Sequence, residues 1–562
     1  MAQHLDLSSQ PIPSSTSYEK GKFGRIFPWL PPCQEDTPQS RIDMFQIAQL
    51  MFEVKGEASE MPVGYTYLGQ FLIHDISFDP TSINERSVDP EFLWNFRTPA
   101  IDLDSVYGGG PGLNSYLYTT DGKHALFWLP EPKRYEKDPT FYDLPRISPP
   151  TNYTALIADP RNDENVIISQ LHAAFLLFHN NTIKRLGKEG KYDCQPDLLF
   201  RSAQQFVKWC FQWVVLNDYL PRIIDISGWD EANNQNYNEP NIVPPYMKAK
   251  IFLKDIAKNI IKRKYFDWRN EPFIPLEFSA AAFRFGHSQV LSQYQFNKDP
   301  SMGDNPSDSK KDLFSSTKES PFRVDMELFF SSVGDKNKTI GPYLSNNLRR
   351  LPTHPNRMGN LSNGLSELLK EISTIKAKLD KKLDEDVAKK NIGSILDNIL
   401  DGLNLSDGSP EIRRFLLDAS MKINERNLAE MNLIRGLKLR LPSGQCVAKA
   451  MGLKTVTVKT DGFPDHLRNN TPLWYYILYE SKVINDGHKL GPVGSRIVAE
   501  VIIGLLQGDK TSFLNQDPNW VPHIKNQKGE QVDFPDFNMV DLLQLAGVIK
   551  GPLSELVQSN PS

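Results

Sequence analysis

The chain has 562 residues, of which 40% are hydrophobic, 23% charged and 10% aromatic, and its formal net charge at pH 7 is −4. This near balance of charges argues against a nucleic-acid partner and against binding to an anionic membrane surface. A chain of this length and composition has ample apolar material for one continuous core around a deep, closed pocket.

Residues 1–40 are rich in Ser, Pro and Gln, and we expect them to form an extended N-terminal arm. This segment lacks the basic start and the apolar core of a Sec signal peptide, and the longest apolar stretches are too short to span a bilayer. The default expectation is a cytoplasmic chain without a transmembrane segment, with non-classical secretion left open. The scattered cysteines have no C-x-x-C spacing and are interpreted as reduced thiols: Cys33, Cys194, Cys210 and Cys446.

From about residue 41 the apolar residues recur at helical spacing, and alternating strand patterns are scarce. The clearest helix is predicted over 165–187, where basic residues and a glycine at the end are typical C-terminal signals. The same periodicity predicts helices within 275–291, 410–436 and 493–508. We therefore predict a mainly α fold with long loops and little β structure, in which residues 41–562 form one large domain.

Two stretches of that domain are interpreted as insertions. Residues 297–321 are polar and rich in turn formers, which is typical of a flexible surface loop. Residues 361–406 are interpreted as a helical insertion, because 365–400 is charged and amphipathic. For this insertion we favour a solvated helical pair on the surface over a helix that binds a partner.

The segment GQFLIHD at 69–75 carries polar groups in otherwise apolar surroundings. On a helix, Gln70 and His74 share one face because they are one turn apart, while Asp75 points elsewhere. An imidazole whose pKa lies near neutrality can take a proton from a bound substrate and return it. The spacing therefore indicates two different tasks, acid–base chemistry on one face and a carboxylate site on the other.

The loop RTPAIDLDSVYGGG at 97–110 offers several oxygen ligands within a few positions. Calcium prefers such oxygen atoms, whether from carboxylates, hydroxyls or backbone carbonyls. The alternative is an acidic turn ahead of a helix, because D-x-D alone is weak evidence of a metal. The predicted calcium ligands are Asp75, Thr98, the Ala100 carbonyl, Asp102 and Asp104.

The segment DPRNDEN precedes the long predicted helix. Arg161 would place a permanent positive charge near a developing anion, and Glu164 is a second acidic group nearby. The alternative for Arg161 is an ordinary ion pair. On the helix itself, His172 and His179 are interpreted as hydrogen-bonded structural groups rather than as metal ligands.

The segment RFGH at 284–287 follows an apolar run with small residues that would let a flat group approach closely. Arg284 precedes His287 by about one turn. A buried neutral imidazole is a common axial ligand of haem iron. The alternative is a structural buried histidine.

The order of these motifs resembles the animal-type haem peroxidases, in particular their bacterial branch. Q-x-x-x-H-D is followed by the D-x-D loop that ends in V-Y-G, by R-x-x-E before a long helix, by F-R-F-G-H, and by MNLIRG at 431–436. The similarity covers residues 41–525. It implies a large helical haem peroxidase fold with haem b and calcium, and a ferryl porphyrin-radical intermediate.

The resemblance assigns roles on both faces of the haem. His74 matches the distal acid–base group, Arg161 the arginine that polarises the O–O bond, and Gln70 the glutamine near peroxide or halide. On the proximal face, His287 matches the iron ligand and Asn432 the residue that accepts a hydrogen bond from it. Arg435 matches a haem-propionate partner, and Arg284 is also counted among the haem-binding residues.

Two positions depart from the vertebrate members of this family. Ile73 stands where an acidic residue esterifies a haem methyl, and Asn165 stands where a methionine forms a sulfonium link. Glu164 matches the second ester-forming residue, so one covalent link to haem remains open. With fewer links we expect a lower iron potential, and therefore iodide, bromide, thiocyanate or phenols as donors in place of chloride.

The resemblance thus predicts a peroxidase whose partners are hydrogen peroxide and a small electron donor. The closest alternative is a fatty-acid dioxygenase of the same superfamily, but Arg284 stands where cyclooxygenases carry a radical-forming tyrosine. An HD-type metal phosphohydrolase, suggested by His74 and Asp75, would leave Gln70 and FRFGH unexplained. A haem-binding protein without turnover is the third alternative.

Overall fold

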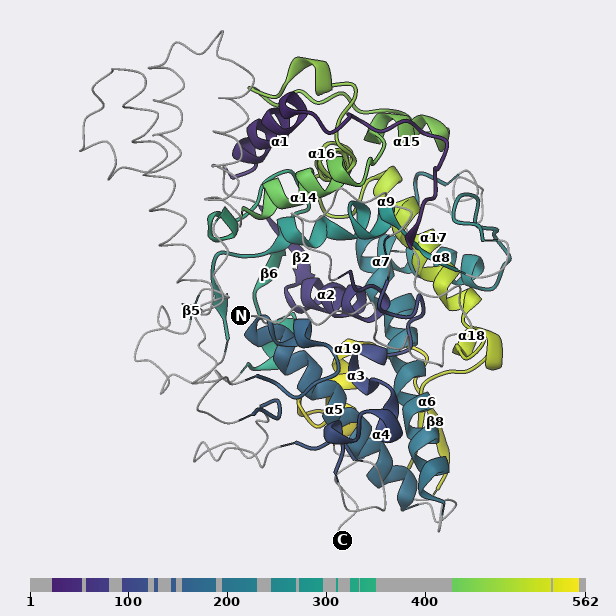
Figure 1. Ribbon diagram of the computed structural model, residues 1–562. Helices are drawn as coiled ribbons and strands as arrows, with labels where there is room; N and C mark the ends of the chain where they lie inside the picture. The colour runs from purple at the N-terminus through teal and green to yellow at the C-terminus, as the bar shows by residue number, and fades with distance from the viewer. Residues whose placement is uncertain are drawn as a thin grey trace, which may run out of the picture.

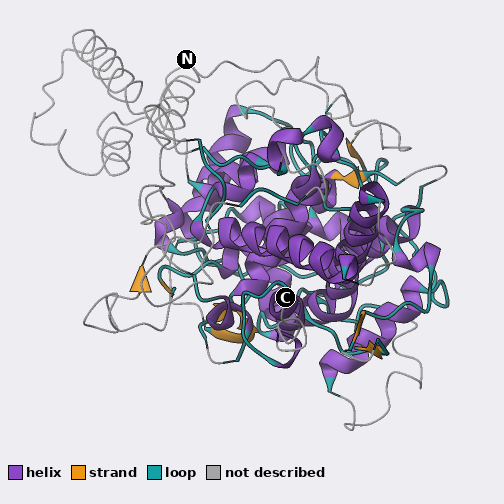
Figure 2. Cartoon of the chain, turned by 90° about the horizontal axis from the view of Figure 1, so that it is seen from below, coloured by secondary structure: helices purple, strands orange, loops and turns teal. Residues whose placement is uncertain are grey.

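The computed structural model of the chain is built mainly from helices, as predicted, and its few strands are short (Figure 1; Figure 2). It describes residues 23–52, 57–79, 93, 95–119, 126–129, 143–147, 154–188, 195–229, 244–268, 272–296, 310–311, 324–332, 334–349, 427–526 and 529–554. The predicted insertion at 361–406 lies outside the described residues, as does 297–321 except for two of its residues.

The helices follow one another along the whole described chain. In the first half they are α1 (Pro38–Leu50), α2 (Gly64–Ile76), α3 (Asp104–Tyr107), α4 (Gly110–Leu113), α5 (Val166–Gly187), α6 (Pro196–Val214), the π-helical η6 (Val215–Tyr219), α7 (Leu220–Ile223) and α8 (Pro245–Ala257). They continue with α9 (Leu276–Ser279), α10 (Met326–Phe330), α14 (Leu428–Lys438), α15 (Gly444–Ala450), α16 (Leu473–Asn485), α17 (Pro492–Gly508), α18 (Phe513–Gln516) and α19 (Met539–Leu545). The 3₁₀ turns are η4 (Ser115–Leu117), η5 (Pro160–Asp163), η8 (Ala282–Gln289), η10 (Asn346–Arg349) and η14 (Asp465–Leu467).

The described strands form separate two-stranded pairs. These are β1 (Phe23–Gly24) parallel to β3 (Ile274–Pro275), and the antiparallel pairs β2 (Ala58–Pro62) with β6 (Lys336–Lys338), β4 (Tyr294–Gln295) with β5 (Lys310–Lys311), and β7 (His523–Lys525) with β8 (Gln531–Asp533). The first pair ties the N-terminal arm to the core. Next to it, the N–H groups of Ile26 and Phe27 donate to the buried carboxylate of Glu277, at 3.1 and 3.0 Å.

Helix α5 positions the site, because it contacts α2, α6 and η5. It begins within one residue of the predicted start, where the Asn165 side chain accepts from two N–H groups of the first turn, at 3.1 and 3.0 Å. Its Phe175 ring stacks on Phe71 of α2, with centroids 4.7 Å apart. Helix α2 is itself mostly buried, and it also contacts η8, α10 and α3.

The segment 275–291 differs from the single predicted helix, because it forms α9 and then the 3₁₀ helix η8. The break falls at Ala281, whose φ of −134° and ψ of −74° are not helical. Arg284 Nε donates to the Ser279 carbonyl at 2.9 Å, which satisfies a carbonyl that the ended helix leaves without its usual partner. The helix predicted at 410–436 is described only from residue 427 onward, where it forms the first part of α14.

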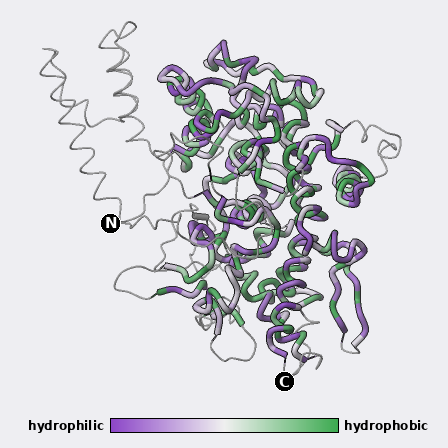
Figure 3. Tube along the Cα trace, turned by 45° about the vertical axis from the view of Figure 1, so that its right-hand side comes forward, coloured by the Kyte–Doolittle hydropathy of each residue, from purple (hydrophilic) through white to green (hydrophobic). Residues whose placement is uncertain are grey.

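Segments far apart in the sequence lie side by side. Helix α1 contacts α14, and Figure 1 shows both near α16 in the upper part of the molecule. Hydrophilic and hydrophobic residues alternate along the helices in Figure 3, as expected where one face of each helix meets the core. Among the described helices, none combines the length and the apolar character needed to cross a bilayer. The described cysteines are free thiols: Cys33, Cys210 and Cys446.

Candidate active site

Helix α2 presents its polar residues in two directions, as their spacing predicts. The Gln70 amide donates to the carboxyl of Glu164, whereas a carboxylate oxygen of Asp75 accepts from the Leu103 N–H at 2.9 Å. His74 is buried, with 7% of the residue exposed. Its Nε2 lies 3.8 Å from the Glu164 carboxyl, which is itself 48% exposed. Gln70, His74 and Glu164 therefore form one cluster, and Asp75 belongs to another.

The orientation of His74 is fixed by Asn162, a residue of η5 that the sequence did not single out. Nδ1 of His74 lies 2.8 Å from the Asn162 amide oxygen, and the Asn162 amide nitrogen lies 3.0 Å from Nδ1 of His172. An amide oxygen can only accept, so Nδ1 of His74 carries the ring proton and Nε2 keeps its lone pair. The signal was present, because Asn162 stands between Arg161 and Glu164 in DPRNDEN, but nothing in the sequence pairs it with two histidines.

The imidazole of His74 is held in its neutral form. Burial, assisted by the positive charge of Arg161, lowers the pKa of His74 to about 3. His172 is also fully buried, and burial lowers its pKa to about 4. The interpretation of His172 as a hydrogen-bonded structural group is thus confirmed, with the addition that its hydrogen bond reaches His74 through one amide.

Arg161 holds the C-terminal end of α2. Its guanidinium donates to the carbonyls of His74 and Ser77, at 2.7 and 2.8 Å, and lies 4.4 Å from the centre of the Phe78 ring. It also forms an ion pair with the buried Asp159, at 2.6 Å. Burial alone would raise the pKa of Asp159, but the hydrogen bonds and charge of Arg161 hold it below its ordinary value. Arg161 thus forms the ordinary ion pair that was its alternative interpretation. It also binds the backbone around His74.

His287 lies in η8, where Asn432 of α14 holds it. The Asn432 amide nitrogen lies 2.8 Å from Nδ1 of His287, because the amide oxygen accepts from Arg284 at 2.6 Å. The Trp474 ring meets the imidazole edge to face, with centroids 6.4 Å apart. Burial and the Arg284 charge lower the pKa of His287 to about 3. Asn432 therefore contacts the imidazole as the resemblance implies, but with its nitrogen rather than its oxygen.

Arg435 lies one turn after Asn432 on α14. Its guanidinium forms an ion pair with the buried carboxylate of Asp79, at 3.1 Å. The short segment after α2 and the helix that carries Asn432 are thereby joined. A role toward a haem propionate stays a prediction.

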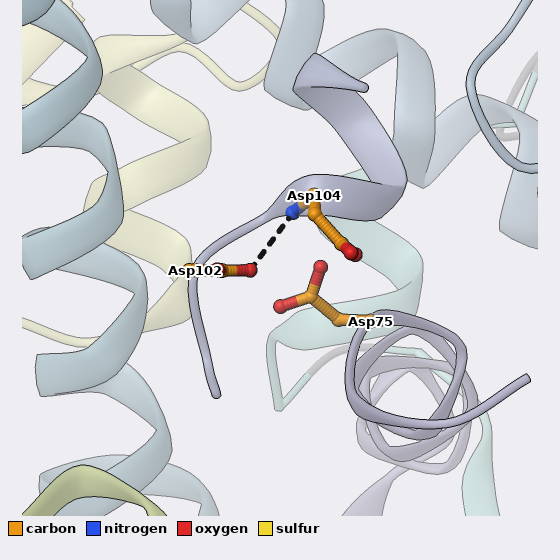
Figure 4. Close-up of side chains that lie close together, drawn as sticks. All are labelled: Asp75, Asp102 and Asp104. Carbon is orange, nitrogen blue, oxygen red and sulfur yellow. Dashed lines mark hydrogen bonds between the residues drawn. The ribbon is translucent and has the colours of Figure 1, made fainter. Parts of the chain in front are cut away.

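Three aspartates come together as the predicted calcium site requires (Figure 4). Oxygen atoms of Asp75, Asp102 and Asp104 all lie within 4.8 Å of one another. Burial first, and then the Asp102 charge, raise the pKa of Asp75 to about 7, while burial also raises the pKa values of Asp102 and Asp104. Such mutual repulsion would be relieved by a bound cation.

The loop around this cluster is shaped by its own hydrogen bonds. The Thr98 hydroxyl donates to Asp102 at 3.0 Å, and the Ala100 residue beside it is buried. Leu103 has a φ of 60°, a left-handed conformation that an L side chain adopts at a cost of roughly 1–2 kcal/mol. Its N–H is the one that donates to Asp75. The loop conformation is thus set by the same carboxylate that α2 contributes.

Comparisons with known proteins agree with the resemblance seen in the sequence. The family model described as animal haem peroxidase matches residues 76–360, half of the chain. Peroxidase A from Dictyostelium discoideum has a similar structure, with a TM-score of 0.53 and 13% identity over 94% of each chain. Fatty acid alpha-dioxygenase from Oryza sativa is also similar, with a TM-score of 0.50 and 14% identity over 85% of this chain and 73% of that one. A search of curated proteins finds no match.

Proposed function

The chain belongs to the animal haem peroxidase family, and on that premise we propose that it is a peroxidase that uses hydrogen peroxide to oxidise a small electron donor. The observation that carries this proposal is the geometry of His74. Its Nδ1 proton is engaged by Asn162 at 2.8 Å, so Nε2 is the free base. Family membership leaves no place for the HD-type phosphohydrolase.

The side chains that could bind haem are suited to that group. Two imidazoles stand on contacting elements, α2 and η8, and each is held through Nδ1, His74 by Asn162 and His287 by Asn432. Nε2 of His74 therefore keeps its lone pair for peroxide. Nδ1 of His287 instead accepts from the Asn432 amide nitrogen, so Nε2 of His287 would bind iron only after that amide turned its oxygen toward Nδ1. His287 would bind the iron, with Asn432 and Arg284 behind it, and Arg435 would pair with a propionate. When bound, haem supplies the redox chemistry, because peroxide withdraws two electrons from it and donors return them.

The residues of the distal cluster move the protons. His74 Nε2 takes the proton from one peroxide oxygen and delivers it to the other, which leaves as water. Arg161 places positive charge beside that transfer, and Gln70 contributes an amide near the bound peroxide. Glu164 is the residue that would carry one ester link to the haem. For each peroxide reduced to two water molecules, two phenols lose one electron each, or one halide ion loses two.

Calcium is proposed at the aspartate cluster. Asp75, Asp102 and Asp104 supply carboxylates, with the Thr98 hydroxyl and the Ala100 carbonyl completing the set. Because Asp75 follows His74 directly, a cation there would fix the backbone that aims the base. The donors we propose are iodide, bromide, thiocyanate and phenols, since Ile73 and Asn165 remove two of the possible covalent links to haem.

The test replaces the base alone. We expect His74→Ala to retain haem and to slow the reaction with peroxide by about 10²–10⁴-fold, the usual contribution of a positioned acid–base group. Replacement of the exposed His488 by Ala is the matched control and should leave the rate unchanged. Stopped-flow absorption gives the rate constants, and an unchanged rate constant in His74→Ala would rule out this role.

A fatty-acid dioxygenase is the second candidate, because the similar structures include such an enzyme. The chain carries Arg284 at the position where cyclooxygenases carry their radical tyrosine. We therefore expect no oxygen uptake when the holoprotein is mixed with linoleate. Rapid uptake of oxygen would favour the dioxygenase.

A further inference from the structure

A buried tyrosine and histidine form a pair that the proposed reaction does not use. Tyr107 ends α3, and its hydroxyl lies 3.1 Å from Nδ1 of His179 on α5. The two residues are 1% and 0% exposed. A phenol in contact with an imidazole nitrogen loses an electron readily, because its proton can move to the nitrogen as the electron leaves.

Burial makes such a base necessary. It raises the pKa of Tyr107 well above the ordinary value of a phenol, so the hydroxyl stays protonated. Removal of one electron from a protonated phenol in an apolar site would leave a buried positive charge, which is costly. Nδ1 of His179, when its ring carries the proton on Nε2, accepts the phenol proton and avoids that charge on the tyrosine.

The pair is connected to the candidate active site. Asp75, which follows His74, accepts hydrogen bonds from the Ser105 N–H and hydroxyl, at 3.2 and 2.9 Å, and Ser105 precedes Tyr107 by two residues on α3. On the other side, His179 lies about 10 Å along α5 from His172, which contacts Asn162. Both members of the pair therefore stand on elements that hold the distal base.

Aromatic residues also link the pair to a segment that carries an exposed tryptophan. The Phe127 ring lies 5.4 Å from the Tyr107 ring, and the Tyr118 ring stacks on Phe127 at 4.7 Å. The Tyr118 hydroxyl donates to the Tyr107 carbonyl at 2.9 Å. Trp128, the next residue after Phe127, is 40% exposed. Through Tyr118, whose hydroxyl binds its carbonyl, Tyr107 is thus linked to the segment that carries the exposed Trp128.

We propose that Tyr107 is a redox-active residue, paired with His179, that passes electrons from aromatic donors at the Trp128 surface to the oxidised haem site. This inference rests on the proposed peroxidase function and adds a second donor site to it. The donors are phenols too large to reach the haem, such as a phenol attached to a polymer.

The electrons and protons balance with hydrogen peroxide as the oxidant. Peroxide accepts two electrons and two protons and becomes two water molecules. In each one-electron step Tyr107 gives an electron to the oxidised haem site, and its proton moves to Nδ1 of His179. A donor phenol then loses an electron, which restores Tyr107, and releases its own proton to water, while His179 returns the first proton to the tyrosine oxygen. Two phenols become two phenoxyl radicals.

The test uses the haem-loaded full chain and Tyr107→Phe, which keeps the ring and removes the hydroxyl. After rapid mixing of the wild-type protein with peroxide and freezing, we expect a tyrosyl EPR signal. This signal should narrow when ring-deuterated tyrosine is incorporated. In the wild-type protein an exchangeable proton coupled to this radical, lost in D₂O, would mark the hydrogen bond from His179. Tyr475→Phe is the matched control, because Tyr475 is buried but its hydroxyl meets the Thr460 hydroxyl, at 3.1 Å, instead of an imidazole.

Tyr107→Phe should lose the tyrosyl signal and oxidise a polymer-linked phenol about tenfold more slowly. Its rates of haem oxidation by peroxide and of iodide oxidation should match the wild type. A tyrosyl signal that persists in Tyr107→Phe, or one absent from the wild type although peroxide oxidises its haem, would overturn the inference. If peroxide left the wild-type haem spectrum unchanged, the peroxidase function itself would fail, and the inference with it.

Discussion

Asn162 is the single residue that decides which nitrogen of His74 is available. Its amide oxygen accepts from Nδ1 of His74 and its amide nitrogen donates to Nδ1 of His172, so one side chain sets both ring protons. Without that acceptor, the imidazole could place its proton on Nε2 or rotate away from the Gln70–Glu164 cluster. In the proposed reaction, the Asn162 amide thus holds the tautomer in which Nε2 of His74 can take a proton.

We therefore expect Asn162→Ala to slow the reaction with peroxide by about 10–100-fold, a typical effect of removing the group that orients a reactive imidazole. Stopped-flow absorption measures the rate constant. Asn181→Ala is the control, because Asn181 lies on α5 with its amide bound to a distant carbonyl, at 3.0 Å from Ala546. Equal rate constants for Asn162→Ala and the wild type would contradict the role given to this amide.

A second prediction at the scale of single residues concerns the effect of His172 on stability. Burial lowers its pKa from 6.5 to about 4, so between these values the unfolded chain binds a proton that the folded protein does not. Stability from this site is complete above pH 6.5 and is lost as the pH falls, by about 1.4 kcal/mol per pH unit. The stability of the wild type relative to His172→Asn should therefore drop by about 2 kcal/mol between pH 7 and pH 5. Urea unfolding measures it, and a constant difference would contradict the neutral buried state.

At the scale of elements, α2 is held near its C-terminal end by two other segments. Arg161 binds the carbonyls at its C-terminal end, and the 97–110 loop closes around Asp75. The two constraints act on neighbouring residues of the last turn. The direction of His74 is therefore determined by two segments that are distant from α2 in sequence.

Calcium should stabilise this arrangement. Neutralising three carboxylates whose oxygen atoms lie within 4.8 Å of one another favours the folded state. At a calcium concentration of about 100 times Kd, the gain is about 2.7 kcal/mol. A thermal melt with calcium should therefore show a higher Tm than one with a chelator, and Asp102→Asn should abolish the difference. The exposed control Asp465→Asn should retain it, and a Tm insensitive to calcium in the wild type would contradict the site.

Prediction from sequence succeeded where the apolar periodicity and the end signals of an element lie within that element. The helix at 165–187 was predicted to within one residue, because periodicity and end signals are local. The segment 275–291 was not, because its break depends on Arg284 reaching back to the Ser279 carbonyl. Spacing alone placed Gln70 and Asp75 on different faces. It could not indicate that Asn162 meets two histidines, since that contact joins three separate elements.

At the scale of the whole molecule, the residues that matter are contributed by segments scattered along the chain and brought together by the helical core. Helix α2 supplies the proposed base His74, η5 supplies Asn162, η8 supplies His287 and α14 supplies Asn432. Motif order predicted His74, His287 and Asn432 through the resemblance to the family, but it did not predict Asn162. The amide orientation of Asn432 was not predictable in this way, because it depends on the Arg284 side chain.

The most direct test of the account is the absorption spectrum of the purified protein, expressed with ample haem, for the wild type, His287→Ala and His74→Ala. We predict a Soret band for the wild type and for His74→Ala, and its loss or a marked shift in His287→Ala, because we propose that His287, and not His74, binds the iron. A colourless wild type, or a Soret band that depends on His74 and not on His287, would contradict it.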